Sequence, residues 1–193
     1  YYLKAWNTAP DLSGASYANE QEVLNLTDVK NGIVDLYAEW DQNRYTIRFD
    51  SNGGNGTMSD IPMLYDQSAT LTNNGFTRVG YTFDGWNTMP DGTGASFIDG
   101  QNVKNLTNKK DVVVTLYARW IPHTYIIQFA GGGATSGEME RQTLTYDEPQ
   151  RLQWNQFKRL GYRFKNWRVV IDNKSQYFND GDTIKNLTAE TGR

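Results

Sequence analysis

The sequence predicts a mainly β (α+β) protein built from tandem copies of one small module. Two observations carry this prediction. Apolar and polar residues alternate in several segments with the period of a half-buried strand, and the same landmarks recur at constant spacing. No stretch shows the sustained pattern of a long amphipathic helix, so we expect at most a short helical turn in each module.

An internal repeat organises the chain. The pattern Trp-Asn-Thr-x-Pro-Asp at Trp6 to Asp11 recurs at Trp86 to Asp91, and Leu-Tyr-Ala-x-Trp at Leu36 to Trp40 recurs at Leu116 to Trp120. Both offsets are 80 residues, and a third, more diverged copy follows after a further 81. About 75 residues can enclose a core of their own, so we expect tandem modules rather than a solenoid.

The repeat divides the chain into three parts. Residues 1–40 are predicted to be the C-terminal half of a repeat, residues 45–120 a complete repeat, and residues 125–193 a diverged repeat that lacks its closing strand. The joints, residues 41–44 and 121–124, span at most about 14 Å when extended. Neighbouring modules should therefore nearly touch, which predicts a semi-rigid spacer.

The strands of a module can be placed from the pattern. Tyr45, Ile47 and Phe49 alternate with polar residues, as a half-buried strand requires. The segment Val112 to Trp120 predicts a closing strand with one apolar face, and Val34 to Trp40 repeats that pattern in the first copy.

Two irregularities interrupt the strands. Trp86 falls out of phase directly after Gly85, which predicts a β-bulge. Val103 and Leu106 stand three residues apart in polar surroundings, which predicts one helical turn. The same spacing recurs at Val23 and Leu26 and at Ile184 and Leu187.

Three motifs of the chain resemble a known family. Tyr45 to Gly54, Phe76 to Thr88 and Val114 to Trp120 look like the internalin B-type repeat, also called the Listeria-Bacteroides repeat, and the likeness covers all three copies. The resemblance implies β-grasp-like (ubiquitin/SUMO-like) modules in tandem on extracellular, virulence-associated bacterial cell-surface proteins, between an adhesive head and a cell-wall anchor. It implies no catalytic residues and no cofactor.

Composition excludes several kinds of function. The net charge is −3 over 193 residues, so no basic field covers the molecule and we expect no nucleic-acid binding. There is no cysteine and a single histidine, which removes thiolate chemistry and Cys- or His-cluster metal sites. No apolar run approaches 18 residues, so we expect no membrane insertion. The sequence does not decide whether a signal peptide precedes Tyr1.

Candidate catalytic and metal sites are weak. Asp50-x-Asn52 before glycines invites a calcium interpretation, but Gly54 and Ile61 stand where an EF-hand loop needs oxygen ligands, so we expect a glycine turn. His123 is expected to be a solvent-facing linker residue rather than part of a triad. Paired carboxylates are not ruled out by counting, yet we expect no enzyme.

The tryptophans allow two interpretations. Flat aromatic faces could bind sugars, but Trp6, Trp86 and Trp167 recur at one module position, which favours a core role. Trp154 is different, because Asn73 takes its place in the second copy. The recurring Asn-Leu-Thr triplets are expected to end the helical turn.

The third copy is the basic one. Residues 125–193 carry 10 basic and 8 acidic groups, against 3 and 7 in residues 1–44. A solvated face is the simplest explanation, and the alternative is a site for anionic groups. The residues of that candidate site are Lys158, Arg159, Arg163, Lys165 and Arg168, with Trp154 as a stacking neighbour; Arg163 and Lys165 are expected on one strand face, opposite Tyr162 and Phe164.

These observations predict a non-enzymatic spacer and adhesion surface, with glycan or glycosaminoglycan binding through the third copy as the alternative and a domain of a surface-anchored hydrolase as a poor third. Expected partners are host or cell-wall glycans or surface proteins. An unpaired sheet edge in the third copy also predicts strand exchange between chains, with Val34 to Trp40 as the incoming strand. Adding a closing strand to the third copy should raise its melting temperature.

Overall fold

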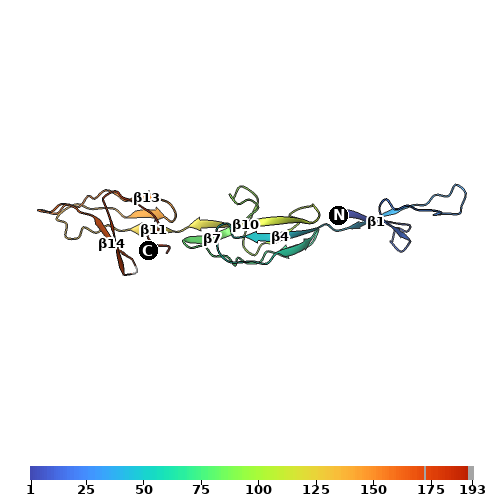
Figure 1. Ribbon diagram of the computed structural model, residues 1–193, viewed down its shortest axis with the longest axis horizontal. Coiled ribbons are helices and arrows are strands. Elements are labelled where there is room, and N and C mark those ends of the chain that lie inside the picture. The colour runs from blue at the N-terminus through green and yellow to red at the C-terminus, as the bar shows by residue number, and fades with distance from the viewer. Residues whose placement is uncertain (172, 191–193) are drawn as a thin grey trace. The chain divides into compact units, whose positions relative to one another are not determined.

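The computed structural model describes residues 1–171 and 173–190. Those residues form strands β1 to β16 and no helix (Figure 1). The prediction of a mainly β protein is confirmed, whereas the likeness to a β-grasp fold is not. The strands are β1 (Tyr2–Asn7), β2 (Ser16–Tyr17), β3 (Tyr37–Asp41), β4 (Arg44–Asp50), β5 (Ile61–Leu64), β6 (Ser68–Thr70), β7 (Tyr81–Asn87), β8 (Ser96–Phe97), β9 (Asn102–Lys104), β10 (Val112–Pro122), β11 (Thr124–Ile127), β12 (Gln142–Thr145), β13 (Gln150–Arg151), β14 (Trp167–Ile171), β15 (Lys174–Phe178) and β16 (Thr183–Ile184).

The chain divides into two compact units, which are described separately. The first contains Tyr1–Asp50, Met58–Asn74 and Asn87–Tyr117. The second contains Ser51–Thr57, Gly75–Trp86 and Ala118–Arg193. Each junction between successive sequence repeats therefore lies inside one unit, and its contacts can be described.

The first copy contributes the sheet β2-β1-β3. Strands β1 and β3 pair antiparallel, and their register shifts between Leu3 and Ala5. This bulge lies at the position equivalent to Gly85, where we predicted one, and Gly85 itself has a φ of 108°. In β7 three consecutive residues, Gly85 to Asn87, are buried, so the alternation of a regular strand is broken at Trp86.

Strand β4 organises the complete repeat. Its alternate side chains Tyr45, Ile47 and Phe49 are buried, as the sequence pattern predicted. The strand pairs antiparallel with β5 and parallel with β10, which lies beside it in Figure 1. The sheet order is β5-β4-β10-β7-β8, so the closing strand β10 is confirmed and has a neighbour on both edges.

The predicted helical turn after residue 102 is wrong. Val103 lies in β9, where it pairs with Ala69 of β6, and Ile184 lies in the equivalent strand β16. Asn105 has a φ of 55°, in the left-handed region, so a right-handed turn cannot pass through it. Apolar spacing alone did not reveal this left-handed residue.

The strand predicted at Val34 to Trp40 forms only in part. Strand β3 begins at Tyr37, and residues 32–36 take no regular structure. Its apolar side chains are consequently uncovered. Leu36 is 39% exposed whereas Leu116, at the same position of β10, is 0% exposed. No strand ladder to a described residue includes residues 32–36.

The third copy repeats the pairings of the second. Tyr125 of β11 pairs with Leu144 of β12 as Tyr45 pairs with Met63, and Gln150 pairs with Ile184 as Ala69 pairs with Val103. The core of this copy consists of Tyr125, Phe129, Leu144, Leu152, Trp167 and Ile184.

Two segments of the third copy depart from the second. Buried Asn87 binds the turn that follows it, donating to the carbonyls of Gly92 and Gly94. Arg168 takes its place 81 residues later, and the turn is replaced by the longer hairpin β14–β15. Residues 162–166, equivalent to most of β7, are not in a strand.

Candidate functional site

The junction between the second and third repeats is a built contact. The Tyr81 hydroxyl donates to a carboxylate oxygen of Asp147 over 2.9 Å, and the Tyr81 ring meets Tyr146 edge to face at 5.9 Å. Backbone hydrogen bonds also cross the junction. The His123 N–H donates to the carbonyl of Gly80, and the Tyr146 N–H donates to the carbonyl of His123. The sequence did not predict this tyrosine–aspartate contact.

The junction between the first and second repeats has the same contact. Tyr1 donates to Asp66 over 2.9 Å and meets the ring of Tyr65 edge to face at 5.9 Å. Tyr65 N–H donates to the carbonyl of Asn43, at the position of His123. One geometry therefore recurs at both junctions, and we call it the tyrosine–aspartate joint.

An asparagine of each Asn-Leu-Thr triplet holds the aspartate of the joint. Asn105 accepts from the Asp66 N–H and donates to the Asp66 carboxylate, at 2.6 and 2.9 Å. Asn186 makes the same two bonds to Asp147, both at or below 2.7 Å. The triplets therefore position the joint and do not end a helix.

Hydrogen bonding in the joint shifts pKa values. Bonds from Asn105 and Tyr1 hold the pKa of Asp66 below its usual value, and bonds from Asn186 and Tyr81 do the same for Asp147. Burial, together with the bond to Asp147, raises the pKa of the Tyr81 hydroxyl. At the second joint, a neutral Tyr81 hydroxyl therefore donates to an ionised Asp147 carboxylate over a wide pH range.

His123 is part of the joint, so its prediction as a solvent-facing linker residue is wrong. The side chain is half-buried, with Nδ1 2.6 Å from the carbonyl oxygen of Ala189 and Nε2 3.0 Å from Thr82 Oγ1. Because a carbonyl only accepts, Nδ1 carries the proton in this contact. The four-residue joint, residues 121–124, had indicated that neighbouring repeats lie close together. Nothing in the sequence indicated the hydrogen-bond partners of His123.

Gly80 allows the close approach at the second joint. Its φ is 78°, and a Cβ on it would overlap the ring carbons of Tyr146. Arg78 stacks over Tyr81 at 3.9 Å from the ring centroid, which adds a cation–π contact to the same ring. Only a glycine fits between the turn and the partner ring.

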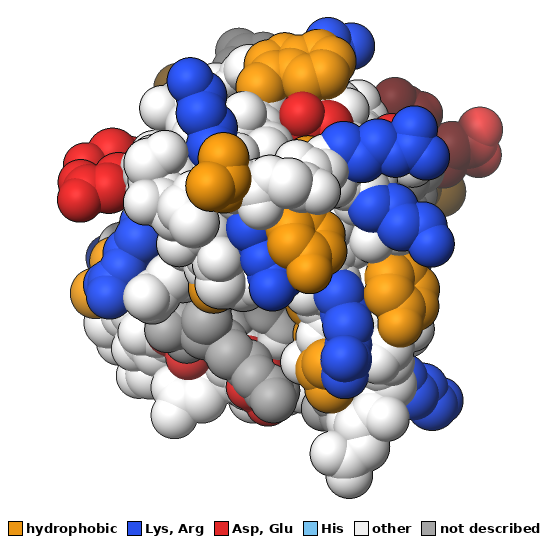
Figure 2. Space-filling model, turned by 90° about the vertical axis from the view of Figure 1, so that its left-hand side faces the viewer, with side chains coloured by type: hydrophobic (Ala, Val, Ile, Leu, Met, Phe, Trp, Pro, Cys, Tyr) orange, Lys and Arg blue, Asp and Glu red, His pale blue; other side chains and the backbone are white. Residues whose placement is uncertain are grey.

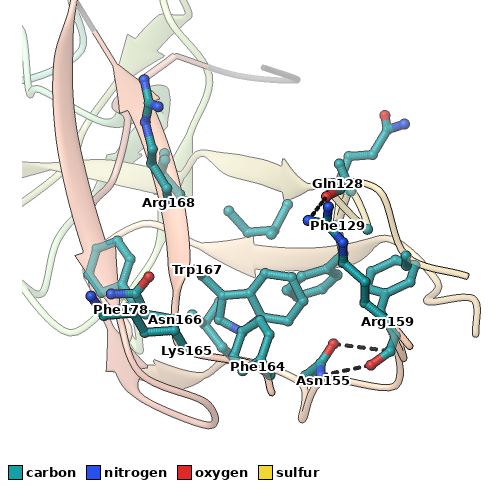
Figure 3. A pocket seen from close by; sticks show the side chains of 18 of the residues that line it. Gln128, Phe129, Asn155, Arg159, Phe164, Lys165, Asn166, Trp167, Arg168 and Phe178 are labelled. Carbon is teal, nitrogen blue, oxygen red and sulfur yellow. Dashed lines mark hydrogen bonds between the residues drawn. The ribbon is translucent and has the colours of Figure 1, made fainter. Parts of the chain in front are cut away.

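The third repeat contains a cavity of about 650 Å³, which we call the basic groove. Its floor is aromatic: Trp167 lies 4.9 Å from Phe129 and 4.7 Å from Phe164, between ring centroids. Figure 3 shows these rings together, with Arg159 and Lys165 on opposite sides of them. All five predicted basic residues line the groove: Lys158, Arg159, Arg163, Lys165 and Arg168.

The groove combines positive charge with apolar surface. Figure 2 shows Lys and Arg side chains interleaved with hydrophobic ones on this face. Arg159 stacks on Tyr162 at 4.1 Å from the ring centroid, as Arg78 stacks on Tyr81. Such a surface suits an anionic partner that also presents apolar groups.

Two details of the predicted basic site differ in the structure. Trp154 is not among the residues that line the groove, because its ring packs against Gly181 instead. Arg163 and Lys165 do line it, but not as one face of a strand: residues 162–166 pair with no described residue, so no ladder defines such faces.

The other candidates have structural explanations. Trp86 and Trp167 are buried, as a core role requires, whereas Trp6 is only half-buried. Gly54 N–H donates to the Ser51 carbonyl in the predicted turn. Within residues 1–171 and 173–190, no group of three or more acidic or histidine side chains could hold a metal ion. In the same residues, no helix is long and apolar enough to cross a membrane.

Fold and site together define a class: an all-β protein whose repeats are joined by recurring contacts. The sequence model of the Listeria-Bacteroides repeat domain matches residues 45–119 and 125–189, and the chain belongs to this family. The resemblance found in the sequence is thereby confirmed.

Two relatives come from Evansella cellulosilytica. The first carries the provisional name Gly-rich membrane protein and is 31% identical over 175 residues, which cover 86% of this chain and 19% of the relative. The second, provisionally named membrane protein, is 28% identical over 156 residues, which cover 78% of this chain and 22% of the relative. This chain thus spans about a fifth of the length of these relatives, and no solved structure matches it.

Proposed function

We propose that the chain is a non-enzymatic spacer segment of an extracellular bacterial surface protein. The observation that carries this proposal is the recurrence of the tyrosine–aspartate joint at both junctions. A joint made of a charge-assisted hydrogen bond, an aromatic pair and backbone bonds restricts the angle between neighbours, whereas a free linker would not. Membership of the repeat family and relatives named as membrane proteins support the location.

The width of a distance distribution tests the spacer. The chain has no cysteine, so Thr57→Cys and Glu148→Cys give two specific spin-label sites in the second unit, both exposed. We expect a narrow distribution, and a broader one when Tyr81→Ala removes the joint. The matched control is Tyr162→Ala, because Tyr162 is the equivalent residue and is 69% exposed. Equal widths in all three proteins would refute the spacer.

A second candidate function is the binding of anionic glycans or wall polymers through the basic groove. It is supported by five cations that surround one aromatic floor. Retention on heparin should fall with salt, as the Debye length drops from about 10 Å at 0.1 M to about 3 Å at 1 M. The double variant Arg163→Glu, Lys165→Glu should elute earlier than Lys174→Glu, which changes an exposed lysine outside the groove. Equal elution would remove this candidate.

A further inference from the structure

We propose that the exposed ring of Trp154 is a stacking site for neutral sugars, which we call the tryptophan platform. It consists of Trp154 and the turn at residues 179–182, on which the ring lies. Trp154 does not line the basic groove, so the two sites are distinct. The inference depends neither on the spacer function nor on anion binding in the groove.

The backbone on both sides of Trp154 is fixed to this turn. The Leu152 N–H donates to the carbonyl of Asp182 over 2.8 Å. The Asn155 N–H donates to a carboxylate oxygen of Asp180 over 2.7 Å. Trp154 lies between these two hydrogen bonds in the sequence, so its backbone is held in place before any ligand arrives. A group that is already ordered loses less conformational entropy on binding.

Gly181 covers one face of the Trp154 ring. A Cβ on Gly181 would lie 2.8 Å from ring atom Cζ2 and 3.0 Å from each of its neighbours Cε2 and Cη2. Such similar distances to three consecutive ring atoms mean that the glycine lies over the face of the ring, because an approach in the ring plane would leave the two outer atoms much farther away. Gly181 is buried and has a φ of 68°, so only a glycine allows the ring to lie on this turn.

The opposite face of the ring is open to water. Trp154 is 60% exposed although Gly181 covers one face, so the exposed area belongs to the other face and the rim. Asn73, at the same position of the second repeat, is exposed as well, and in that repeat the closing strand β10 is paired on both edges. Exposure at this position is therefore independent of the closing strand.

The second repeat builds the same turn without a tryptophan. There the Asn74 N–H donates to a carboxylate oxygen of Asp99 over 2.9 Å, which is the bond that Asn155 makes in the third repeat. Asn73 takes the place of Trp154, and a Cβ on Gly100 would lie 2.8 Å from its Oδ1. The turn thus forms with a small polar side chain on its glycine. A role in holding the turn together does not explain the tryptophan.

The polar groups beside the ring suit hydroxyl groups and disfavour anions. One carboxylate oxygen of Asp180 accepts from the Asn155 N–H, and one of Asp182 accepts from the Asn179 N–H over 2.6 Å. An ionised carboxylate has about four lone-pair sites, so both side chains can accept further bonds from sugar hydroxyls. A sulfated or phosphorylated ligand would instead meet like charge here.

A neutral pyranose matches the ring and the carboxylates together. The C–H bonds on one face of the sugar pack on the negative face of the indole, and this contact removes apolar surface from water. The hydroxyl groups lie at the rim of the sugar, where they reach the acceptors of the turn. A purely apolar ligand would cover the ring but leave the carboxylates without donors.

Titration of the full chain with neutral oligosaccharides tests the platform. The probes are cellopentaose and chitopentaose at millimolar concentration, and the readout is the indole N–H NMR signal of Trp154, assigned by its loss in Trp154→Ala. We expect both probes to shift this signal equally at about 0.1 M and about 1 M salt, since no charge pairing is involved. Heparin should not shift it. If neither probe moves the signal, or if only the Trp167 signal responds, the proposal is wrong.

Substitutions separate the ring from its support. Followed on the signals of the oligosaccharide, Trp154→Ala should weaken binding roughly tenfold, whereas Trp154→Tyr, which keeps a flat ring, should retain most of it. Gly181→Ala should weaken binding because its Cβ displaces the ring. Gly100→Ala is the matched control, since Gly100 has a φ of 65° in the equivalent turn of the second repeat. Unchanged affinity in Trp154→Ala, or equal losses in the two glycine variants, would overturn the proposal.

A transplanted platform is the sharpest test. The double variant Asn73→Trp, Ile98→Asn gives the turn of the second repeat the residues found at Trp154 and Asn179. We expect a new indole signal that responds to the same oligosaccharides as Trp154 does. A folded transplant that does not respond would contradict the proposal.

A polyproline peptide tests the other kind of ligand that a flat ring could take. It is titrated under the same conditions, and we expect the Trp154 signal to stay in place. If the peptide shifts that signal while the oligosaccharides do not, the platform binds protein and the sugar proposal is wrong.

Discussion

The second and third repeats share their pairings but differ in one strand. In the second, β10 has neighbours on both edges and Leu116 is completely buried. In the third, the hairpin β11–β12 and the pair β13–β16 keep the same registers, yet the place of β10 is a cavity and residues 162–166 are irregular. The antiparallel pairings therefore recur in both repeats, whereas strands at the positions of β7 and β10 are described only in the second.

The first copy shows the complementary case. Strands β1 and β3 pair across the predicted bulge without a counterpart of β4, but residues 32–36, which would pair with it, take no regular structure. In the first copy the antiparallel pairing of β1 with β3 is present, and among the described residues that copy has no parallel ladder like the one between β4 and β10.

The largest expected effect compares the buried Leu116 with Leu36, its partly exposed equivalent in the first copy. Leu116→Ala should destabilise the protein by about 2–5 kcal/mol, because it empties a closed core. Leu36→Ala, at the same position of the first copy, should cost less than about 1 kcal/mol because that side chain is already half in water. Urea unfolding of the two variants measures the difference. Similar urea midpoints for the two variants would show that burial of Leu116 does not stabilise the second repeat more than Leu36 stabilises the first.

The next effect separates the joint from backbone strain. Gly80 and Gly161 both have a φ of 78°, but a Cβ at Gly80 would overlap Tyr146, whereas nothing lies near one at Gly161. Gly161→Ala should cost about 1–2 kcal/mol from the left-handed conformation alone. Gly80→Ala should cost clearly more and should also broaden the distance between spin labels across the joint. Thermal unfolding that is equal for both variants would contradict a tight joint.

The sequence predicted the strands well and the joints poorly. Alternation at Tyr45, Ile47 and Phe49 sufficed to place β4, because a half-buried strand imposes period two on its own residues. The joint depends on Asp66 and Asp147, whose left-handed conformations and partners 39 residues away leave no periodic trace. A recurring signal was present, because Asn-Leu-Thr repeats at constant offset, but it was attributed to a helix end.

The basic groove was predicted in part for a similar reason. The five cations stand within eleven residues of sequence, so their clustering could be read directly. The aromatic floor could not, because Phe129 and Trp167 come together only when the repeat folds. Trp154 was included for its uniqueness, which says nothing about where a side chain points.

Acid should loosen both joints. Since the pKa values of Asp66 and Asp147 are lowered, their contribution to stability is complete above the ordinary carboxyl pKa of about 3.9 and is lost as pH falls through the lowered values. Urea unfolding between pH 6 and pH 2 should show a steeper loss for the wild type than for Asp147→Asn, which cannot titrate. Parallel curves would mean that the joint makes no electrostatic contribution.

The smallest expected effect compares the ion pair between β7 and β10 of the second repeat with its counterpart in the first, where the signs are reversed. Asp84→Lys gives the second repeat the residue of the third and places it against Arg119, so it should cost roughly 0.2–1 kcal/mol, the range of an exposed ion pair. Adding Arg119→Glu recreates the pair of the first repeat and should recover most of that loss. The double-mutant cycle, measured by urea unfolding at low salt, gives the coupling between the two positions. A coupling of zero would mean that this ion pair makes no net contribution to the stability of the second repeat. A coupling that vanishes at 1 M salt would instead identify it as a screened surface interaction, which stabilises the pairing of β7 with β10 only at low ionic strength.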